Sequence, residues 1–204
     1  MEIYLIRHTT PKIEKGICYG QTDIPVVDSF SVEAESVLQQ LPDTFDMIYS
    51  SPSNRCFKLA QMIQPSQSIV TDKRLLEMNF GDWEMKKWDE INQDELHKWT
   101  QDFVNVNVPN GENFTQLNIR VNHFMHEITK QNFNKVAVVT HSGVIRSFVI
   151  SVLGIPNENA FKFAIDYGSV TKINIESDST YNNVVFLNKV PAFPLNIDVF
   201  KYSP

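Results

Sequence analysis

The sequence is poor in the features that mark several protein classes. Its 204 residues include only two cysteines, Cys18 and Cys56, too few for a disulfide scaffold and without the spacing of a metal site. No run approaches the roughly 18 consecutive apolar residues that a membrane helix needs, and the first residues lack the charged and apolar regions of a signal peptide. We therefore expect two free thiols in a soluble, cytoplasmic protein.

Positive charge is also scarce. The formal net charge is -6, with 18 basic and 24 acidic residues, and no basic stripe runs along the chain. A protein that binds a nucleic-acid backbone needs such a stripe to displace counterions, so we expect no nucleic-acid partner. A phosphorylated small molecule remains a suitable partner, because a few arginines that converge in a cleft set the local potential whatever the overall charge.

What is present is the composition of a globular protein with alternating element types. Hydrophobic residues make up 42% and charged residues 21%. Strand-like apolar runs lie at 3–6, 47–49, 136–139, 170–175 and 184–187, and segments of helical spacing lie at 31–41, 53–63, 88–103, 114–128 and 143–153. This alternation predicts an α/β fold, a three-layer sandwich with a mostly parallel central sheet flanked by helices.

The length favours one domain over residues 1–204. The segment of about 75–114 lies between core strands and is rich in Trp, Asp and Glu, which suits an inserted lid over an active site. Residues 189–204 carry three prolines and no clear period. We expect them to form an extended tail that packs on the body or contacts a partner, and a homodimer bridged by this tail is one such arrangement.

Two predicted strands each end at a histidine. The first strand reaches Arg7 and His8, and the strand at 136–139 leads to His141, which directly precedes an apolar helix. Ligands of parallel α/β sheets bind beyond the carboxyl ends of the strands, and the free N–H groups at the start of a helix favour an anion. A lone histidine is more often a hydrogen-bonded core residue, but two at equivalent strand ends favour a functional site.

Arg55 adds a second permanent positive charge beside Arg7. It lies in the first turn of the predicted helix 53–63, where the helix dipole disfavours a cation. A bound anion would explain its position, and so would an ordinary pair with a surface carboxylate. Arg7 and Arg55 offer two planar forks that suit bidentate phosphate binding, and a neutral His8 between them can attack phosphorus.

The leaving alkoxide of such a reaction needs a proton donor. We favour Glu77, whose apolar neighbours in Leu75–Phe80 would keep it protonated. Asp82 and Glu84 are rival donors, less favoured because they are expected to be more exposed.

The remaining candidates have ordinary structural explanations. His123 and His126 are three residues apart on a predicted helix, but no nearby carboxylate or Cys completes a ligand set, so no metal is expected. His97 is interpreted in the same way. Trp83 and Trp88 could stack on an aromatic leaving group, although aromatic residues at this spacing more often cover a core.

The ordered set of site residues resembles the signature of the histidine phosphatase superfamily, also called phosphoglycerate mutase-like: Arg7-His8, Arg55 after a Ser-Ser-Pro turn, Glu77, and His141-Ser142-Gly143. The resemblance implies the fold of that superfamily and hydrolysis of a phosphomonoester without metal or cofactor. It also implies that His8 is the phosphorylated nucleophile and that Glu77 is the acid and later the base. Arg7, Arg55 and His141 then clamp the transferred group.

Segments 5–11 and 16–25 resemble the α-ribazole phosphatase branch of this superfamily. That branch removes the 5′-phosphate of α-ribazole phosphate, or of the cobalamin phosphate precursor, late in vitamin B12 assembly. Thr9 departs from the commonest motif of the superfamily, which has Gly after the histidine, and its hydroxyl either adds a phosphate contact or narrows the pocket. The Gly-Glu that follows the histidine in phosphoglycerate mutases is absent, which favours hydrolysis over mutase chemistry.

The leading interpretation is therefore an α-ribazole 5′-phosphate phosphatase. A broad phosphatase for sugar phosphates or nucleotides would keep the chemistry and change the substrate. A non-catalytic domain that binds a phosphorylated ligand would keep only the fold, and the presence of all five site residues counts against it.

Overall fold

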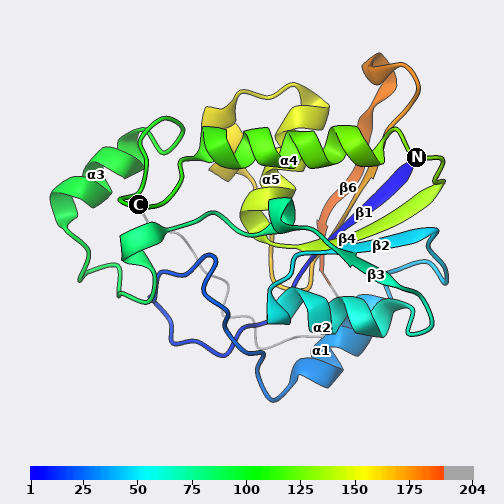
Figure 1. Cartoon of the computed structure of the whole chain (residues 1–204), viewed down its shortest axis with the longest axis horizontal. Helices are drawn as coiled ribbons and strands as arrows, with labels where there is room; N and C mark the ends of the chain where they lie inside the picture. The colour runs from blue at the N-terminus through cyan, green and yellow to red at the C-terminus, as the bar shows by residue number, and fades with distance from the viewer. Residues whose placement is uncertain (191–204) are drawn as a thin grey trace.

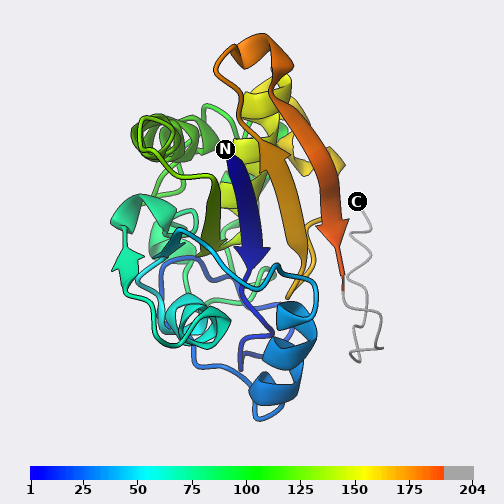
Figure 2. The ribbon, with the colours of Figure 1, turned by 90° about the vertical axis from the view of Figure 1, so that its right-hand side faces the viewer.

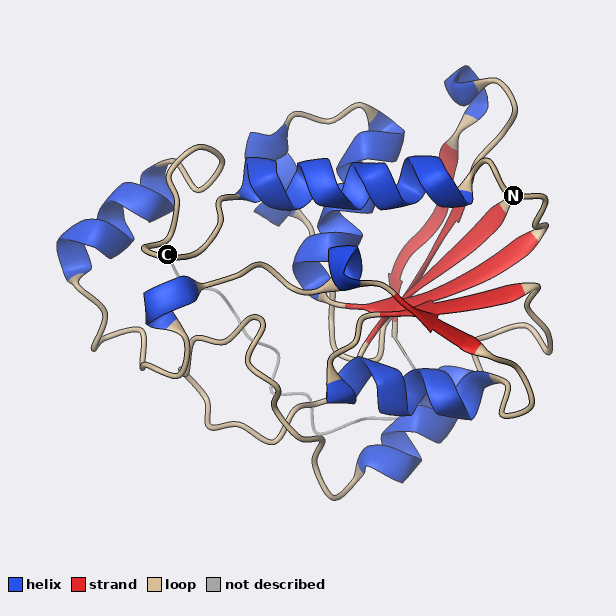
Figure 3. Ribbon diagram, in the orientation of Figure 1, coloured by secondary structure: helices blue, strands red, loops and turns tan. Residues whose placement is uncertain are grey.

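The computed structural model describes residues 1–190 and contains one mixed sheet with helices on both faces (Figures 1 and 3). The strands are β1 (Glu2–Arg7), β2 (Met47–Ser50), β3 (Ile69–Thr71), β4 (Lys135–Thr140), β5 (Val170–Asn174) and β6 (Asn183–Lys189). The α-helices are α1 (Phe30–Leu38), α2 (Asn54–Ile63), α3 (Gln93–Gln101), α4 (Phe114–Ile128) and α5 (Ser142–Leu153). Short 3₁₀ helices are η1 (Lys73–Leu75), η2 (Gly81–Trp83), η3 (Asn157–Lys162) and η4 (Ser179–Tyr181).

The sheet confirms the predicted α/β class. Its strands lie in the order β3-β2-β4-β1-β5-β6, with β4 between β2 and β1 and parallel to both. Among the described strands, β5 alone points opposite to the others, so β1 and β6 point the same way, as Figure 2 shows in blue and orange-red. The prediction of a mostly parallel sheet is therefore correct.

Alternation along the central strands sends apolar side chains to both faces of the sheet. Ile3 and Leu5 of β1 belong to the cluster covered by α4 and α5. Tyr4 and Ile6 belong to the cluster on the opposite face, covered by α1 and α2. Figure 1 shows these two helix layers above and below the sheet. β1 and β4 are thus buried on both faces, and their charged side chains lie at the strand ends.

The helix predicted at 88–103 is shorter than expected. It begins only at Gln93, because the side chain of Asn92 accepts hydrogen bonds from the backbone N–H groups of Asp94 and Glu95 and caps the first turn. The strand β3 was not predicted, since its three residues are partly exposed at the sheet edge and carry no apolar run.

The predicted lid segment, 75–114, contains η2 and α3 and lies to one side of the sheet (Figure 1). Its aromatic residues pack on one another rather than facing solvent: Trp99 lies 5.7 Å from Trp83 and 6.0 Å from Phe80 between ring centroids, both in edge-to-face geometry. The segment therefore has a small aromatic core of its own. Its role as a lid stays a prediction.

Two other expectations can be compared only with residues 1–190. Within 1–190, no helix has the length and apolar character that crossing a membrane requires. Of the expected tail 189–204, only the first two residues are described, so that the tail and the single-domain extent over 1–204 stay predictions.

Candidate active site

The register of two parallel strands brings both histidines to one edge of the sheet. Arg7, the last residue of β1, lies opposite Thr140, the last residue of β4. The backbone N–H of His8 then donates to the carbonyl of Thr140 at 3.0 Å. The imidazole rings of His8 and His141 lie 5.1 Å apart between centroids, in edge-to-face geometry. The predicted meeting of these two residues is confirmed.

His8 is held in one tautomer. Its Nδ1 lies 2.7 Å from the carbonyl oxygen of Thr9, and because a carbonyl can only accept, Nδ1 carries the proton. The lone pair is then on Nε2. Burial lowers the pKa of His8 well below its ordinary value, and the positive charges of Arg55 and Arg7 lower it further. The ring is therefore a neutral imidazole near pH 7, which is the nucleophilic form.

Arg55 is the second residue of α2 and is fully buried. Its Nη2 donates to the carbonyl of Gly20 at 2.6 Å, and its Nη1 donates to the carbonyl of Thr22 at 2.9 Å. Among residues 1–190 no carboxylate pairs with Arg55, so the alternative explanation from the sequence, an ordinary pair with a surface carboxylate, finds no support there. The neutral carbonyls orient the guanidinium without cancelling its charge, so the charge remains available to an anion.

His141 sits at the start of α5 and is held by groups on both sides of its ring. Nη2 of Arg55 lies 3.3 Å from its Nδ1, and since arginine only donates, Nδ1 is the acceptor. Nε2 therefore carries the proton and donates to Oγ of Ser51 at 2.9 Å. Burial, followed by the charge of Arg55, lowers the pKa of His141 well below its ordinary value. The second imidazole is thus a neutral hydrogen-bond donor beside His8.

Arg7 is fixed by a backbone acceptor and by an aromatic ring. Its Nη1 donates to the carbonyl of Ile165 at 2.5 Å. Its guanidinium carbon lies 3.8 Å from the ring centroid of Tyr167, close enough for a cation–π contact. The loop before β5, which the sequence did not suggest as part of the site, therefore sets the direction of this charge.

Glu77 reaches the same place from the loop that follows η1. Its Oε1 accepts from the backbone N–H of Met78 at 2.9 Å, and both of its oxygens lie 3.2 Å from the backbone N of Gly143 at the start of α5. Oγ of Ser142 donates to Oε2 at 3.2 Å. The carboxyl group thus faces three hydrogen-bond donors, and not the apolar surroundings that the sequence predicted. A Cβ built on Gly143 would lie 2.4 Å from Oε1, so a larger residue at this position would push the carboxyl group out of its present place.

The backbone of Glu77 is held by Arg120, a residue of α4 that the sequence did not single out. Its Nη2 donates to the carbonyl of Glu77 at 2.9 Å, and its Nη1 donates to the carbonyls of Arg74 and Leu76, both at 2.7 Å. The carboxylate of Glu112 pairs with the same guanidinium, with Nη2 and Oε1 at 2.6 Å. One arginine thus ties the predicted acid segment to α4.

The two rival acids have other roles in the structure. Glu84 is half-buried, and its carboxylate accepts from the backbone N–H groups of Gln21 at 2.8 Å and Thr22 at 2.6 Å and from the hydroxyl of Thr22. It therefore holds the loop whose carbonyls orient Arg55. Asp82 is exposed and accepts from Nδ2 of Asn110 at 2.9 Å.

Several donors of the site have no hydrogen-bond partner within residues 1–190. These buried atoms are Nε of Arg7, Nε of Arg55 and Oγ1 of Thr9, whose side chain is 0% exposed. Buried donors in proteins are nearly always paired. Three unpaired donors, two of which belong to the arginines themselves, suit an anion that has several oxygen atoms.

The other sequence candidates lie apart from this constellation. Trp83 is buried in the core, and Trp88 packs edge-to-face on Phe80. His97, His123 and His126 are exposed helix residues. Both cysteines are buried free thiols, as expected.

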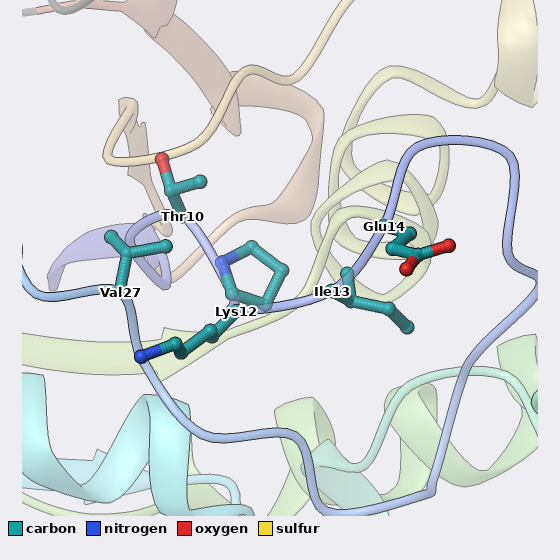
Figure 4. A pocket seen from close by; sticks show the side chains of 6 residues that line it. Thr10, Lys12, Ile13, Glu14 and Val27 are labelled. Carbon is teal, nitrogen blue, oxygen red and sulfur yellow. The ribbon is translucent and has the colours of Figure 1, made fainter.

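A surface pocket of about 350 Å³ lies on the chain just after the site (Figure 4). It is lined by Thr10, Pro11, Lys12, Ile13, Glu14 and Val27. Its lining includes none of the buried residues of the candidate active site, so the two are separate features.

Known proteins resemble the chain over most of its length. A Hydrogenobacter thermophilus protein provisionally named phosphoserine phosphatase 2 is 30% identical, with 92% of this chain and 95% of that protein covered. The adenosylcobalamin/α-ribazole phosphatase of Escherichia coli is 27% identical, with 86% and 90% covered. The crystal structure of the α-ribazole phosphatase from Shigella flexneri superimposes with a TM-score of 0.85 at 25% identity, covering 93% of this chain and 96% of that chain.

The family model described as histidine phosphatase superfamily (branch 1) matches residues 3–188. This match covers nearly all of the described residues and includes every predicted site residue. The chain therefore belongs to the histidine phosphatase superfamily, branch 1.

Proposed function

We propose that this chain hydrolyses phosphomonoesters through a phosphohistidine on His8, and that α-ribazole 5′-phosphate is its substrate. The observation that carries the chemistry is the fixed tautomer of His8, whose Nδ1–H is bonded to the carbonyl of Thr9 at 2.7 Å. A buried neutral imidazole with its lone pair on Nε2, flanked by two arginines, is a nucleophile prepared for phosphorus.

In the first step, Nε2 of His8 forms a bond to phosphorus while the bond from phosphorus to the ester oxygen breaks. The protonated carboxyl of Glu77 gives its proton to that oxygen, so an alcohol leaves. Arg7 and Arg55 stabilise the charge on the equatorial oxygens, and His141 joins them when its Nε2–H turns from Oγ of Ser51 to a phosphoryl oxygen. The carbonyl of Thr9 stabilises the positive charge of the phosphorylated imidazole through Nδ1–H.

In the second step, the Glu77 carboxylate takes a proton from a water molecule as the water oxygen attacks phosphorus. The bond from phosphorus to Nε2 breaks, and its electron pair returns to His8. Inorganic phosphate leaves, and Glu77 is protonated again. None of these steps requires a metal or a cofactor.

The substrate assignment is supported by a segment that contacts both Arg55 and Glu77. The segment 16–25, which resembles the α-ribazole branch, supplies the two carbonyls that orient Arg55. Gln21 of this segment also donates to the carbonyl of Glu77 at 3.0 Å. A segment in contact with both the phosphate-binding arginine and the acid is well placed to meet the leaving group. The α-ribazole phosphatases of Escherichia coli and Shigella flexneri, which resemble this chain, support the same assignment.

A second substrate, phosphoserine, is favoured by one specific observation. The Hydrogenobacter thermophilus relative named for that activity is 30% identical over 195 residues. Phosphoserine differs from α-ribazole phosphate in its small, doubly charged leaving group, so a direct comparison of the two esters separates the proposals.

The test is the release of phosphate, in the presence of a chelator, from α-ribazole 5′-phosphate, phosphoserine, 3-phosphoglycerate, p-nitrophenyl phosphate and a panel of nucleotides. We expect the highest kcat/KM for α-ribazole 5′-phosphate. A higher value for phosphoserine would replace the substrate assignment, and similar values across the panel would indicate a broad phosphatase. No turnover of any ester would favour a domain that only binds phosphorylated ligands.

The histidine mechanism is tested with His8→Ala and with rapid quenching. The variant should lose at least about a thousandfold in kcat, whereas His123→Ala, which alters an exposed residue of α4, should keep the wild-type value. Quenching into base during turnover should trap a phosphate on His8 that peptide mass spectrometry can locate. Turnover by His8→Ala at the wild-type rate would refute the mechanism.

A further inference from the structure

The nucleophile of the proposed reaction is almost fully covered. His8 is 2% exposed, Arg55 is 0% exposed and His141 is 1% exposed. A phosphate ester must bring its phosphorus within bonding reach of Nε2 of His8, so some part of the protein has to move before the reaction can begin. The residues that lie between the histidine and solvent are therefore part of the catalytic cycle.

Two half-buried tyrosines from distant parts of the chain meet beside His8. The hydroxyls of Tyr19 and Tyr167 are hydrogen-bonded at 2.5 Å, and both side chains are half-buried. The ring of Tyr167 lies 5.5 Å from the ring of His8 between centroids. Tyr19 belongs to the long loop between β1 and α1, and Tyr167 belongs to the loop that leads into β5. One hydroxyl pair thus joins two loops beside the nucleophile.

The same two rings contact both arginines. The guanidinium carbon of Arg7 lies 3.8 Å from the ring centroid of Tyr167, and that of Arg55 lies 5.5 Å from the ring centroid of Tyr19. The contact with Arg7 is the closer one, and the same loop supplies the carbonyl of Ile165 to this guanidinium. Movement of Tyr167 would therefore release His8 and loosen Arg7 together.

We propose that Tyr19 and Tyr167 form a hydrogen-bonded cover over His8, which separates to admit the phosphate ester, and that the ring of Tyr167 positions Arg7. The proposal deepens the proposed function, because it names the residues that control access to the same site. Separating the two hydroxyls costs little free energy, because each of them exchanges a neutral hydrogen bond for one with water. The closed form lowers the apparent affinity for the substrate by the fraction of molecules that are open.

The cover is tested by the rate at which diethyl pyrocarbonate modifies His8, measured on the intact chain by peptide mass spectrometry with the exposed His123 as internal reference. Tyr19→Phe and Tyr167→Phe should each raise the rate at His8 about 3- to 10-fold, the range that corresponds to one neutral hydrogen bond. The double variant should rise no further, because both changes remove the same bond. Tyr181→Phe, at a residue that is 68% exposed in η4, should leave the rate unchanged.

Rates that stay at the wild-type value in both single variants would overturn the cover, and so would effects that multiply in the double variant. Phenylalanine keeps both rings in place, and a thermal unfolding curve of each variant checks that it is folded. The labelling does not require turnover. If the wild type released no phosphate from any ester, the proposed function would fail while the labelling still decided the question of the cover.

The positioning role of the ring is tested with Tyr167→Leu, by competitive inhibition with inorganic phosphate. Loss of the cation–π contact should raise the inhibition constant about 3- to 10-fold relative to Tyr167→Phe, which keeps the ring. Equal constants for the two variants would overturn this part of the proposal. A change in the phosphate constant is specific, because a merely structural defect would lower the melting temperature without altering phosphate binding in the folded fraction.

Discussion

The two buried imidazoles should make the fold sensitive to acid. Burial and the neighbouring arginines lower the pKa values of His8 and His141 well below the ordinary value near 6.5. Below that pH the unfolded chain binds a proton at each of these residues, whereas the folded protein keeps both neutral until its own lower pKa values are reached. The unfolded state thus holds more protons, so the free energy of unfolding must fall as the pH falls.

The size of the effect follows from the number of protons. Each histidine contributes a slope of up to about 1.4 kcal/mol per pH unit once the unfolded state is protonated. Between pH 7.5 and pH 5 the upper limit is roughly 2 kcal/mol per histidine and about 4 kcal/mol for the pair, reached when both imidazoles stay neutral in the folded protein throughout this range. Since a typical domain has a total of about 5–15 kcal/mol, the loss should be easy to measure.

The assay is urea unfolding at pH 7.5, 6.5, 5.5 and 5.0, a range above the titration of most carboxylates. His8→Asn should remove about half of the slope because only His141 then remains as a buried imidazole. His123→Asn changes a histidine on the exposed face of α4 and leaves the buried pair intact, so its slope should match the wild type. A wild-type free energy that stays constant from pH 7.5 to 5.0 would refute the reasoning.

Three further variants test the surroundings of His8. Glu77→Gln should lower kcat at least about tenfold while the inhibition constant for inorganic phosphate stays nearly constant, because it removes the proton donor and keeps the shape; full kcat would make the acid assignment wrong. Arg120 makes five hydrogen bonds, to three carbonyls and to the carboxylate of Glu112, and the three donors of a lysine ammonium cannot replace them. For Arg120→Lys, kcat should therefore fall and the pH profile of kcat should shift with little change in KM, whereas Arg74→Lys, a change in η1, should alter neither. Thr9→Val removes a buried unpaired hydroxyl, and without ligand its melting temperature should rise by about 2–4 °C. The same variant should bind inorganic phosphate more weakly by calorimetry, and unchanged binding would exclude Thr9 as a phosphate contact.

The residues that lie next to strand ends could be predicted from the sequence. An apolar run that stops at Arg7 and His8, and a second that stops before His141, indicates a common sheet edge whenever the two strands are parallel. The β1–β4 register confirms that relation. Arg55 followed from its unfavourable place near a helix start, although only the structure shows that backbone carbonyls hold it.

Other residues of the site could not be found in this way, because their role depends on tertiary contacts. Arg120 lies on the amphipathic helix α4, where an arginine on a polar face looks ordinary until its distance to the Glu77 carbonyl is known. Tyr19 and Tyr167 are separated by 148 positions in the chain and share no local pattern. The start of α3 was also missed. The apolar spacing extends back to Trp88, whereas the helix begins after its cap at Asn92.

The position of β4 in the sheet has a consequence for synthesis of the protein. β4 separates β2 from β1, so the pair of β2 and β3 cannot join β1 until residues 135–140 have left the ribosome. The same late strand leads to His141 and to the helix start that holds Glu77. A nascent chain that already contains His8 and Arg55 therefore has neither an assembled sheet nor a complete site. Its apolar β1 should depend on chaperones until more than two thirds of the chain has been translated.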